Sequence, residues 1–270
     1  MLYRVTSFFL IVFAFVSCST NPVTGRQQFK LVSEQELQAM ATTEYRNFLS
    51  TNRVVSASAD RDAEMVRRVG SRLANSITQY YRSRGLAEVL DGYKWEFNLV
   101  RDNDANAWAM PGGKIVVYSG LLPISRNEAG LANVLGHEIS HAIFQHGNER
   151  MSQGLAQQLG GAALSIALAN KPTQTRDLFM QAYGVGSAVG VLLPFSRKQE
   201  LEADRYGMRW AAMAGYNPRE AINLWKRMVA QSNQAKPPEF LSTHPAENRR
   251  IAELEKYVDE ALKYYKPSRR

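Results

Sequence analysis

Two of the four histidines in this 270-residue chain stand in one five-residue string, His137-Glu138-Ile139-Ser140-His141. On a helix, residues four positions apart project from the same face, so both imidazoles would lie together. Glu138, directly after the first histidine, would then lie beside anything that the pair binds. The spacing therefore predicts a helix through residues 137–141 with one face suited to a metal ion, because neutral imidazole nitrogens are common zinc ligands.

The same string holds the groups that metal-assisted hydrolysis needs. His137 and His141 would supply two ligands to one Zn²⁺ per chain, with a third protein ligand and one position left for water. Glu138 would take a proton from that water as it attacks a peptide carbonyl, and would later donate it to the leaving amine. The alternative is an amphipathic helix with two surface histidines and no metal.

The third ligand must come from another part of the chain. His146 lies nine residues after His137, so in a continuous helix it would face the opposite side; we expect it to end that helix. In residues 196–207, Glu200 and Asp204 would share one helix face while Glu202 points elsewhere. Glu200 would complete a His-His-Glu site, and Asp204 would accept the second N–H of a ligand histidine. Without the HExxH string, such an acidic helix would be read as a solvated face.

Length and composition allow one domain of about 200 residues behind a targeting segment. Hydrophobic residues make up 45% of the chain and charged residues 21%, which is ordinary for a globular protein. The net charge of +8 is spread over arginine pairs rather than one block, and no aromatic-basic motif accompanies it. We therefore expect no nucleic-acid partner.

The N-terminus reads as a secretory signal, residues 1–17, with a basic residue followed by an apolar run too short to span a membrane. The sequence Phe15-Val16-Ser17-Cys18 resembles a bacterial lipobox, which predicts lipidation of Cys18 and a lipidated tether over residues 18–32 ahead of a peptidase domain, 33–270. Ser19 is not the Asp that favours inner-membrane retention, so we expect an outer-membrane lipoprotein facing the periplasm. The alternative is an ordinary cleaved signal, or an N-terminal anchor, with an incidental cysteine.

Periodicity and capping signals predict a mostly helical α+β domain with a small sheet next to the HExxH helix. The expected helices are 33–50, 60–85, one opened by a capping box at Ser125 and Glu128, one starting at Asn217-Pro218, and a last one ending near Tyr265. The expected strands are 93–99 and a hairpin over 105–118. The Ala- and Gly-rich segments 154–169 and 178–193 are interpreted as buried or gating helices rather than membrane spans.

Several motifs resemble one metallopeptidase family, in order, over nearly all of the chain that follows the signal. They are Asn21-Pro-Val-Thr-Gly-Arg26, Asn106-Ala-Trp-Ala-Met-Pro-Gly-Gly113, Tyr118-Ser-Gly-Leu-Leu122, His137–His141, Glu200–Gly207, and Thr243-His-Pro followed by Arg250-Ile251. The family is that of the CAAX prenyl endopeptidases and the heat-shock protease HtpX, and the chain is most similar to its soluble periplasmic lipoprotein members. The resemblance implies a zincin-type fold with Glu200, not Glu202, as the third zinc ligand. The multiple spanning helices of the prenyl endopeptidases have no counterpart here, which argues against prenyl-protein processing.

The resemblance also implies roles for residues outside the ligand set. The strand Ala107, Trp108, Ala109, Met110 is similar to an edge strand that holds substrate in extended form. His244 matches a displaceable zinc ligand that would hold the enzyme in a resting state; the alternative is a capping histidine in a Pro-bounded loop. Arg250 would stabilise the oxyanion or a substrate carbonyl, or would be an ordinary surface arginine.

Together these features predict a zinc endopeptidase that degrades unfolded or misassembled cell-envelope proteins. Its partners would be those substrates and the membrane that holds its N-terminal lipid. Two alternatives stay open: a chaperone-like lipoprotein that binds envelope proteins through a groove beside a latched zinc site, and a zinc hydrolase of peptidoglycan cross-links.

Overall fold

The computed structural model of the protein describes residues 18–159, 172–185, 195–232, 238–245 and 248–267. The predicted signal peptide, 1–17, lies outside the described residues, as do large parts of the two Ala- and Gly-rich segments. Within the described residues, no helix combines the length and apolar character that crossing a bilayer requires.

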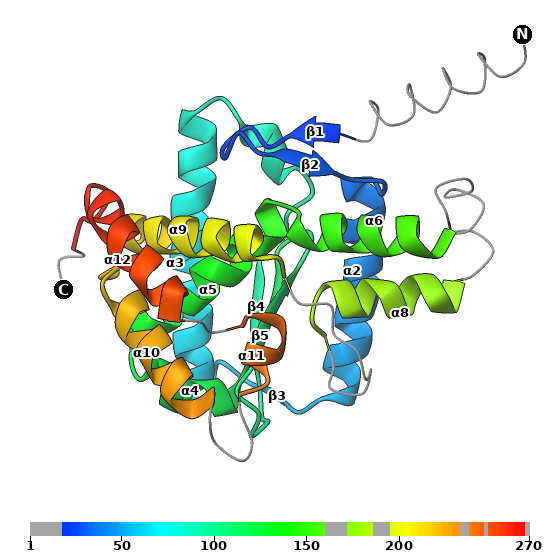
Figure 1. The fold of residues 1–270 in the computed structure, drawn as a ribbon. Helices are drawn as coiled ribbons and strands as arrows, with labels where there is room; N and C mark the ends of the chain where they lie inside the picture. The colour runs from blue at the N-terminus through cyan, green and yellow to red at the C-terminus, as the bar shows by residue number, and fades with distance from the viewer. Residues whose placement is uncertain (1–17, 160–171, 186–194, 233–237, 246–247, 268–270) are drawn as a thin grey trace, which may run out of the picture.

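Helices make up most of the described chain, with two small sheets (Figure 1). The α-helices are α2 (Glu34–Thr51), α3 (Arg61–Ser83), α4 (Leu122–Ser125), α5 (Glu128–Ile143), α6 (His146–Leu159), α8 (Pro172–Ala182), α9 (Arg197–Met213), α10 (Glu220–Ser232), α11 (Phe240–Thr243) and α12 (Asn248–Leu262). The strands are β1 (Cys18–Thr20), β2 (Gln27–Phe29), β3 (Val54–Val55), β4 (Glu96–Val100), β5 (Ala107–Met110) and β6 (Lys114–Tyr118). The α+β class predicted from the sequence is confirmed.

The main sheet has the strand order β3-β4-β6-β5, which places β5 at one edge. β4 runs parallel to β6, and β5 runs antiparallel to it as the predicted hairpin. Since side chains alternate along a strand, the two faces join different cores. Phe97, Ile115 and Val117 pack with α3 and α5, whereas Trp108 and Val116 pack with α2, α6 and α8. The sheet therefore lies between two helical layers, with α5 against one face.

Most local signals in the sequence place the element ends correctly. Ser33 caps α2 in a capping box, and Asp60 caps α3 by accepting two backbone N–H bonds. The strand predicted from residue 93 begins at Glu96, because Tyr93 N donates to Leu90 O and closes a turn first.

The predicted capping box at Ser125 is wrong. Ser125 belongs to α4, where its hydroxyl donates to Leu122 O, and Arg126 adopts a φ of 66° that ends this short helix. Asn127 is the residue that caps α5, since its side chain accepts from Gly130 N. Ser125 and Asn127 are both residue types that cap helices, and they lie only two positions apart. The apolar periodicity of the helix does not show which of them is the cap.

Helices α5 and α9 cross in backbone contact at two glycines (Figure 1). A Cβ at Gly136 would stand 2.6 Å from Gly207 O, and one at Gly207 would stand 2.7 Å from His137 N. Any side chain at either position would push the helices apart, because real Cβ atoms do not approach backbone so closely. The contact brings the face of α9 that carries Glu200 and Asp204 against the HExxH helix.

Candidate metal centre and active site

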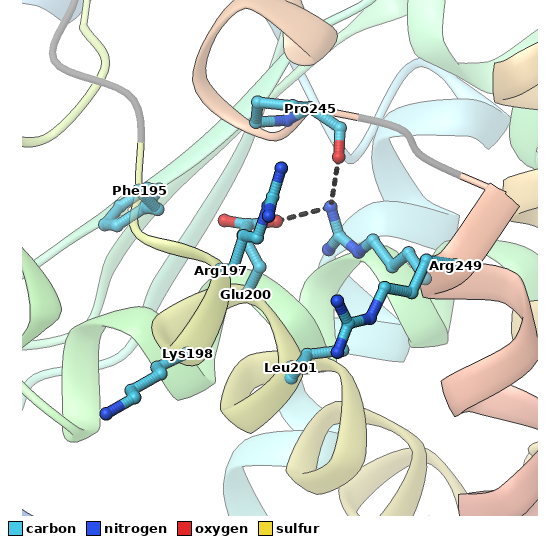
Figure 2. A pocket seen from close by; sticks show the side chains of 8 residues that line it. Phe195, Arg197, Lys198, Glu200, Leu201, Pro245 and Arg249 are labelled. Carbon is cyan, nitrogen blue, oxygen red and sulfur yellow. Dashed lines mark hydrogen bonds and ion pairs between the residues drawn. The ribbon is translucent and has the colours of Figure 1, made fainter.

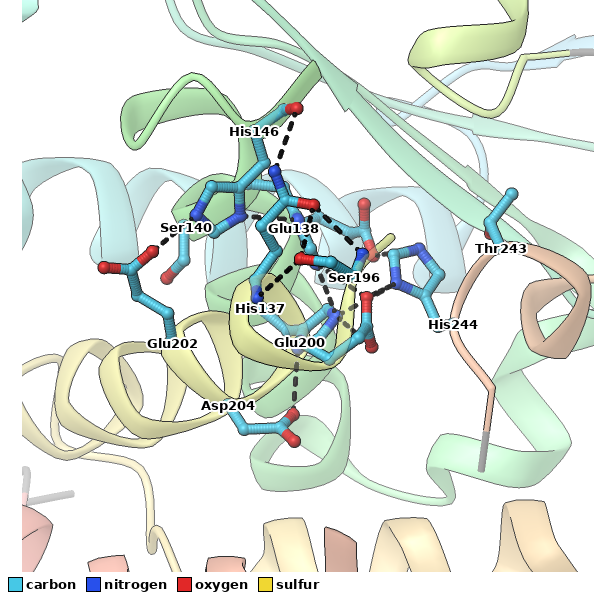
Figure 3. Close-up of polar contacts among 12 residues, drawn as sticks. His137, Glu138, Ser140, His146, Ser196, Glu200, Glu202, Asp204, Thr243 and His244 are labelled. Atoms are coloured by element: carbon cyan, nitrogen blue, oxygen red, sulfur yellow. Dashed lines mark hydrogen bonds and ion pairs between the residues drawn. The ribbon is translucent and has the colours of Figure 1, made fainter. Parts of the chain in front are cut away.

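Four ligand-type side chains from three segments meet in the protein interior. They are His137 and His141 from α5, Glu200 from the first turns of α9, and His244 from the residue after α11. One ligand atom from each can be chosen so that all four lie within 4.8 Å of one another. None of the four is more than 5% exposed. Figure 3 shows the side chains of His137, Glu200 and His244 converging between the two helices and the α11 loop.

The distances within this cluster match what a tetrahedral zinc ion requires. Zn–N bonds of about 2.0–2.1 Å put two ligand nitrogens about 3.3 Å apart. His137 Nε2 lies 3.0 Å from His141 Nε2 and 3.2 Å from His244 Nδ1. Glu200 Oε1 lies 3.3 Å from His141 Nε2. Nitrogen lone pairs that face one another at this range repel unless a cation lies between them, so the donor set fits a bound metal.

The electrostatics of the cluster also suit a cation. Burial holds the pKa of His141 well below its usual value and lowers the pKa of His244 to about 4, so both rings are neutral at physiological pH. Burial alone would raise the pKa of Glu200, but Arg250 and His244 outweigh it and hold that pKa well below its usual range. Neutral imidazoles and an ionised carboxylate are the forms in which these groups bind zinc.

Glu138 lies at the same centre but is not one of the four residues of the cluster. Its side chain is buried, with one carboxylate oxygen 3.4 Å from His244 Nε2. That oxygen has no hydrogen-bond partner among the described residues. Burial, and then the nearby charge of Glu200, raise the pKa of Glu138 well above its usual value. A divalent cation beside it would favour the ionised form that a general base needs.

Asp204 and Arg250 bind two members of the cluster, His137 and Glu200. Asp204 Oδ1 accepts from His137 Nδ1 at 2.9 Å, the geometry predicted for fixing that tautomer. Arg250 donates to both Asp204 oxygens, at 2.5 and 2.8 Å, and also pairs with Glu200. Its guanidinium lies 3.6 Å from the Trp225 ring centroid. The interpretation of Arg250 as a surface arginine is wrong, because the residue is 5% exposed; its oxyanion role stays a prediction.

The predicted place of His146 is also wrong. α5 ends at Ile143, Gln145 takes a φ of 55°, and His146 begins α6 instead of ending the motif helix. The turn reverses the chain and brings His146 Nδ1 within 2.9 Å of His141 Nδ1. The expectation that His146 faces away from His137 assumed a continuous helix, and the left-handed residue Gln145 ends that helix. His146 is not part of the four-residue cluster, as expected.

Comparison with known proteins decides the family. The sequence pattern of peptidase family M48 matches residues 60–258, which include every residue of the cluster. The chain belongs to peptidase family M48. It is a zinc-dependent metalloendopeptidase in the class that the HExxH string predicts.

Relatives of this chain include proteases with two kinds of name. Mitochondrial metalloendopeptidase OMA1 of Schizosaccharomyces pombe is 32% identical over 93% of this chain and 69% of its own length. The OMA1 protein of Saccharomyces cerevisiae is 35% identical over 67% of this chain and 52% of its own. The beta-barrel assembly-enhancing protease of Escherichia coli is 31% identical over 66% of this chain and 38% of its own. These names confirm the metallopeptidase family, but they are not those of prenyl endopeptidases or HtpX.

In this M48 protein, β5 occupies the edge position predicted for substrate binding. It pairs with β6 on one side and with no other strand among the described residues. Its four residues are nevertheless buried, with Ala109 the most exposed at 5%. Phe240 N, from α11, donates to Ala105 O just ahead of the strand. An extended peptide could pair with β5 only after this edge becomes accessible.

A cavity of about 340 Å³ reaches the metal cluster from the surface (Figure 2). Glu200, Arg250, Phe195 and Pro245 are among the residues that line it. Its remaining lining residues are Arg197, Lys198, Leu201 and Arg249. The cavity offers a route by which water can reach Glu200.

One buried cation near the cluster was not singled out from the sequence. Arg150, on α6, is 4% exposed and lies 3.3 Å from the Phe195 ring centroid. Burial lowers the pKa of Arg150 to about 9, although the charges of Glu200 and Glu138 act against this. In the sequence it is one of many helical arginines, and no spacing rule marks it.

Proposed function

We propose that this protein cleaves unfolded or misassembled proteins of the bacterial cell envelope. In this proposal, His137, His141 and Glu200 bind the zinc, Glu138 is the general base, and Asp204 orients His137. The observation that carries the proposal is the buried carboxylate of Glu138 at the centre of the four-ligand cluster. A carboxylate in that place serves proton transfer, since it does not complete the ligand set.

The chain's own groups account for the steps of peptide hydrolysis. A bound zinc would polarise the scissile carbonyl and acidify the attacking water. Glu138 takes the proton of that water and later gives it to the leaving amine. Asp204 and Arg250 keep His137 in one tautomer and orientation throughout. β5 would bind the substrate as an added strand. Its hydrogen bonds would be to main-chain atoms of the substrate, so substrates with varied side chains would be accepted.

Strand addition requires an extended segment, so unfolded chains are the favoured substrates. The test is digestion of casein beside a folded protein of similar length. Casein is expected to be cut at many sites while the folded protein stays intact. Equal cleavage of both would contradict selection for unfolded chains. Casein digestion also measures the effect of replacing Glu138.

We place the protein at the periplasmic face of the outer membrane, tethered through Cys18 and residues 18–32, with residues 33–270 as the peptidase domain. The lipobox-like sequence supports this, as does similarity to a bacterial protease named for β-barrel assembly. Because other relatives are named as mitochondrial proteins, the proposed location needs a direct test. In a bacterial host, the wild-type protein should fractionate with outer membranes, and Cys18→Ser should not. Identical fractionation of the two would contradict a lipid anchor on Cys18.

We propose that His244 is a displaceable fourth ligand. Its Nδ1 lies 3.2 Å from His137 Nε2 and 2.9 Å from Glu200 Oε1, so it would take the position that water needs. The competing capping role has support too, since His244 ends α11 and its N–H bonds to Phe240 O. If the latched state predominates by about tenfold, His244→Ala should raise kcat/KM by about tenfold.

Peptide hydrolysis by the zinc-loaded variant measures this effect. The matched control is Thr243→Val, which disturbs the same buried loop but keeps the imidazole. Thr243→Val should not raise kcat/KM, because the imidazole stays in place. If His244→Ala lowered kcat/KM instead of raising it, the histidine would be a structural cap rather than a latch.

A latched site also keeps the chaperone-like alternative open. Four protein ligands would close a zinc ion to water, so a latched site would not cleave, and clients would bind once the buried strand β5 becomes accessible. Such a state could bind clients without cutting them efficiently.

A further inference from the structure

A second chain of polar contacts leads away from the metal cluster on the side opposite Asp204. It begins at His141 and passes through His146 and Glu202 to Arg26, in the segment just after β1. His146 Nε2 lies 2.8 Å from Glu202 Oε2, and Arg26 Nε donates to the same oxygen at 2.8 Å. Figure 3 shows Glu202 turned toward His146 and away from Glu200. Three segments remote in sequence therefore meet in one line.

The direction of each hydrogen bond in this line follows from proton counting. If His141 binds zinc through Nε2, its one ring proton is on Nδ1, which donates to His146 Nδ1. His146 must then carry its own proton on Nε2, where it donates to Glu202 Oε2. As an ionised carboxylate, Glu202 accepts from both His146 and Arg26 through Oε2, and Arg26 supplies the matching charge. Every donor in the line meets one acceptor, and no ring nitrogen is left without a role.

Because these side chains are buried, any polar atom left without a hydrogen-bond partner would destabilise the folded protein. The side chain of His146 is fully buried, and that of Glu202 is 9% exposed. Arg26 also binds both oxygens of Glu149 on α6, at 2.7 and 2.6 Å. Buried polar groups persist where all of them are paired, because an unpaired one is strongly destabilising. A complete network of this kind holds its members in one geometry.

The two HExxH histidines are supported in parallel ways. His137 is backed directly by Asp204, and Arg250 binds that carboxylate. His141 is backed by Glu202 and Arg26, with His146 inserted as a spacer. Partners of this kind fix the ring orientation of a metal-binding histidine and its tautomer.

The segment that carries Arg26 is held firmly against the helices of the site. Asn21 Oδ1 accepts from the N–H groups of Val23 and Thr24, which folds the segment into a turn. Tyr206, on α9, donates its hydroxyl to Val23 O, and the buried Gln28 side chain donates to Phe144 O at the end of α5. Arg26 therefore reaches Glu202 from a fixed position.

We propose that Arg26, Glu202 and His146 form a positioning chain for His141, so that the segment from Asn21 to Phe29 is a working part of the metal site. The proposal rests on His141 being a zinc ligand, as proposed above. None of the three binds the metal or the substrate; they act through the orientation of the His141 ring. A displacement of this segment would change the orientation of the His141 ring through three contacts in series: Arg26–Glu202, Glu202–His146 and His146–His141.

The competing explanation is that Arg26 only clamps α6 to α9. The rate of zinc loss to excess chelator separates the two, together with the visible absorption spectrum of the cobalt-substituted full-length protein. His146→Leu and Arg26→Ala should each lose zinc about 10–100-fold faster than wild type. Their cobalt spectra should also shift, because the ligand field changes when His141 tilts.

Two further variants sharpen the test. His146→Asn places an amide oxygen where Nδ1 stood, so it should recover much of the slow zinc loss that His146→Leu forfeits. Arg209→Ala is the matched control, since it breaks a partly buried arginine–carboxylate pair with Glu260 that does not reach the cluster. It should lower thermal stability and leave zinc loss and the cobalt spectrum unchanged.

The outcomes distinguish this proposal from the proposed function. Wild-type zinc loss in His146→Leu and Arg26→Ala, with only a fall in stability as in Arg209→Ala, would reduce the chain to a clamp. If His141→Ala kept its zinc, the ligand assignment itself would fail. If zinc loss depended on Arg26 and His146 as expected but the wild-type protein cleaved no casein, the protease function would fail while the positioning chain stood.

Discussion

Replacing Glu138 with glutamine is expected to lower kcat for casein cleavage by about 10²–10⁴-fold while the bound zinc is retained. Glutamine matches the shape of the side chain but cannot accept a proton from the attacking water. Glu138 is outside the four-ligand cluster, so its loss should not release the metal. The measurement is digestion by wild type and variant, both shown by metal analysis to hold one zinc per chain.

The control for this variant is Glu64→Gln, an exposed glutamate on α3 that should leave cleavage unchanged. Equal cleavage by wild type and Glu138→Gln would point to a contaminating protease and remove Glu138 from its role. Absence of cleavage by either protein would favour the latched, chaperone-like state. Rescue of envelope defects by Glu138→Gln as fully as by wild type would favour that alternative as well.

Removal of the metal is the second large effect, and it should abolish activity and lower stability together. Without a cation, three imidazole rings and a carboxylate would remain buried and facing one another. A ligand present at about 1,000 times its Kd stabilises the folded state by about 4.1 kcal/mol, and chelation removes that contribution. Thermal unfolding with and without chelator measures the change, and added zinc should restore the original Tm.

His137→Ala is the genetic counterpart of chelation. It should unfold at or below the temperature of the chelated wild-type protein, because Asp204 loses its histidine partner as well. Its Tm should respond to neither chelator nor added zinc. A variant that still gained stability from zinc would show that His137 is not needed for the site.

The HExxH helix and the α9 carboxylates illustrate what local sequence predicts well. The spacings His137–His141 and Glu200–Asp204 are each four residues, and helical geometry turns that spacing into a shared face wherever the helix lies. Caps such as Ser33 and Asp60 act over three residues, so they too were predictable. The same locality explains the error at Ser125, where neighbouring Asn127 competes for the same role.

His146 marks the point at which local reasoning fails. Its distance from His141 depends on one left-handed residue, Gln145. Because this residue is not a glycine, the sequence does not indicate a turn at that position. Glu202 was correctly expected to point away from the metal, but its partner Arg26 lies 176 residues earlier in the chain. Pairing at that separation is set by how β1–β2, α6 and α9 dock, which a helical period does not encode.

The sequence by itself determined which chemical groups this protein brings to its candidate site: two histidines, the carboxylate proposed as base and the glutamate proposed as ligand, each placed on its helix face by fixed backbone geometry. Only the tertiary structure decided how those faces meet. The contact between Gly136 and Gly207 sets the distance between α5 and α9, and the α11 loop carries His244 into the cluster. The burial of Arg250 and the line from His141 to Arg26 also arise only when distant segments pack. Covalent spacing acts over one or two helical turns, whereas packing and pairing act across the whole chain.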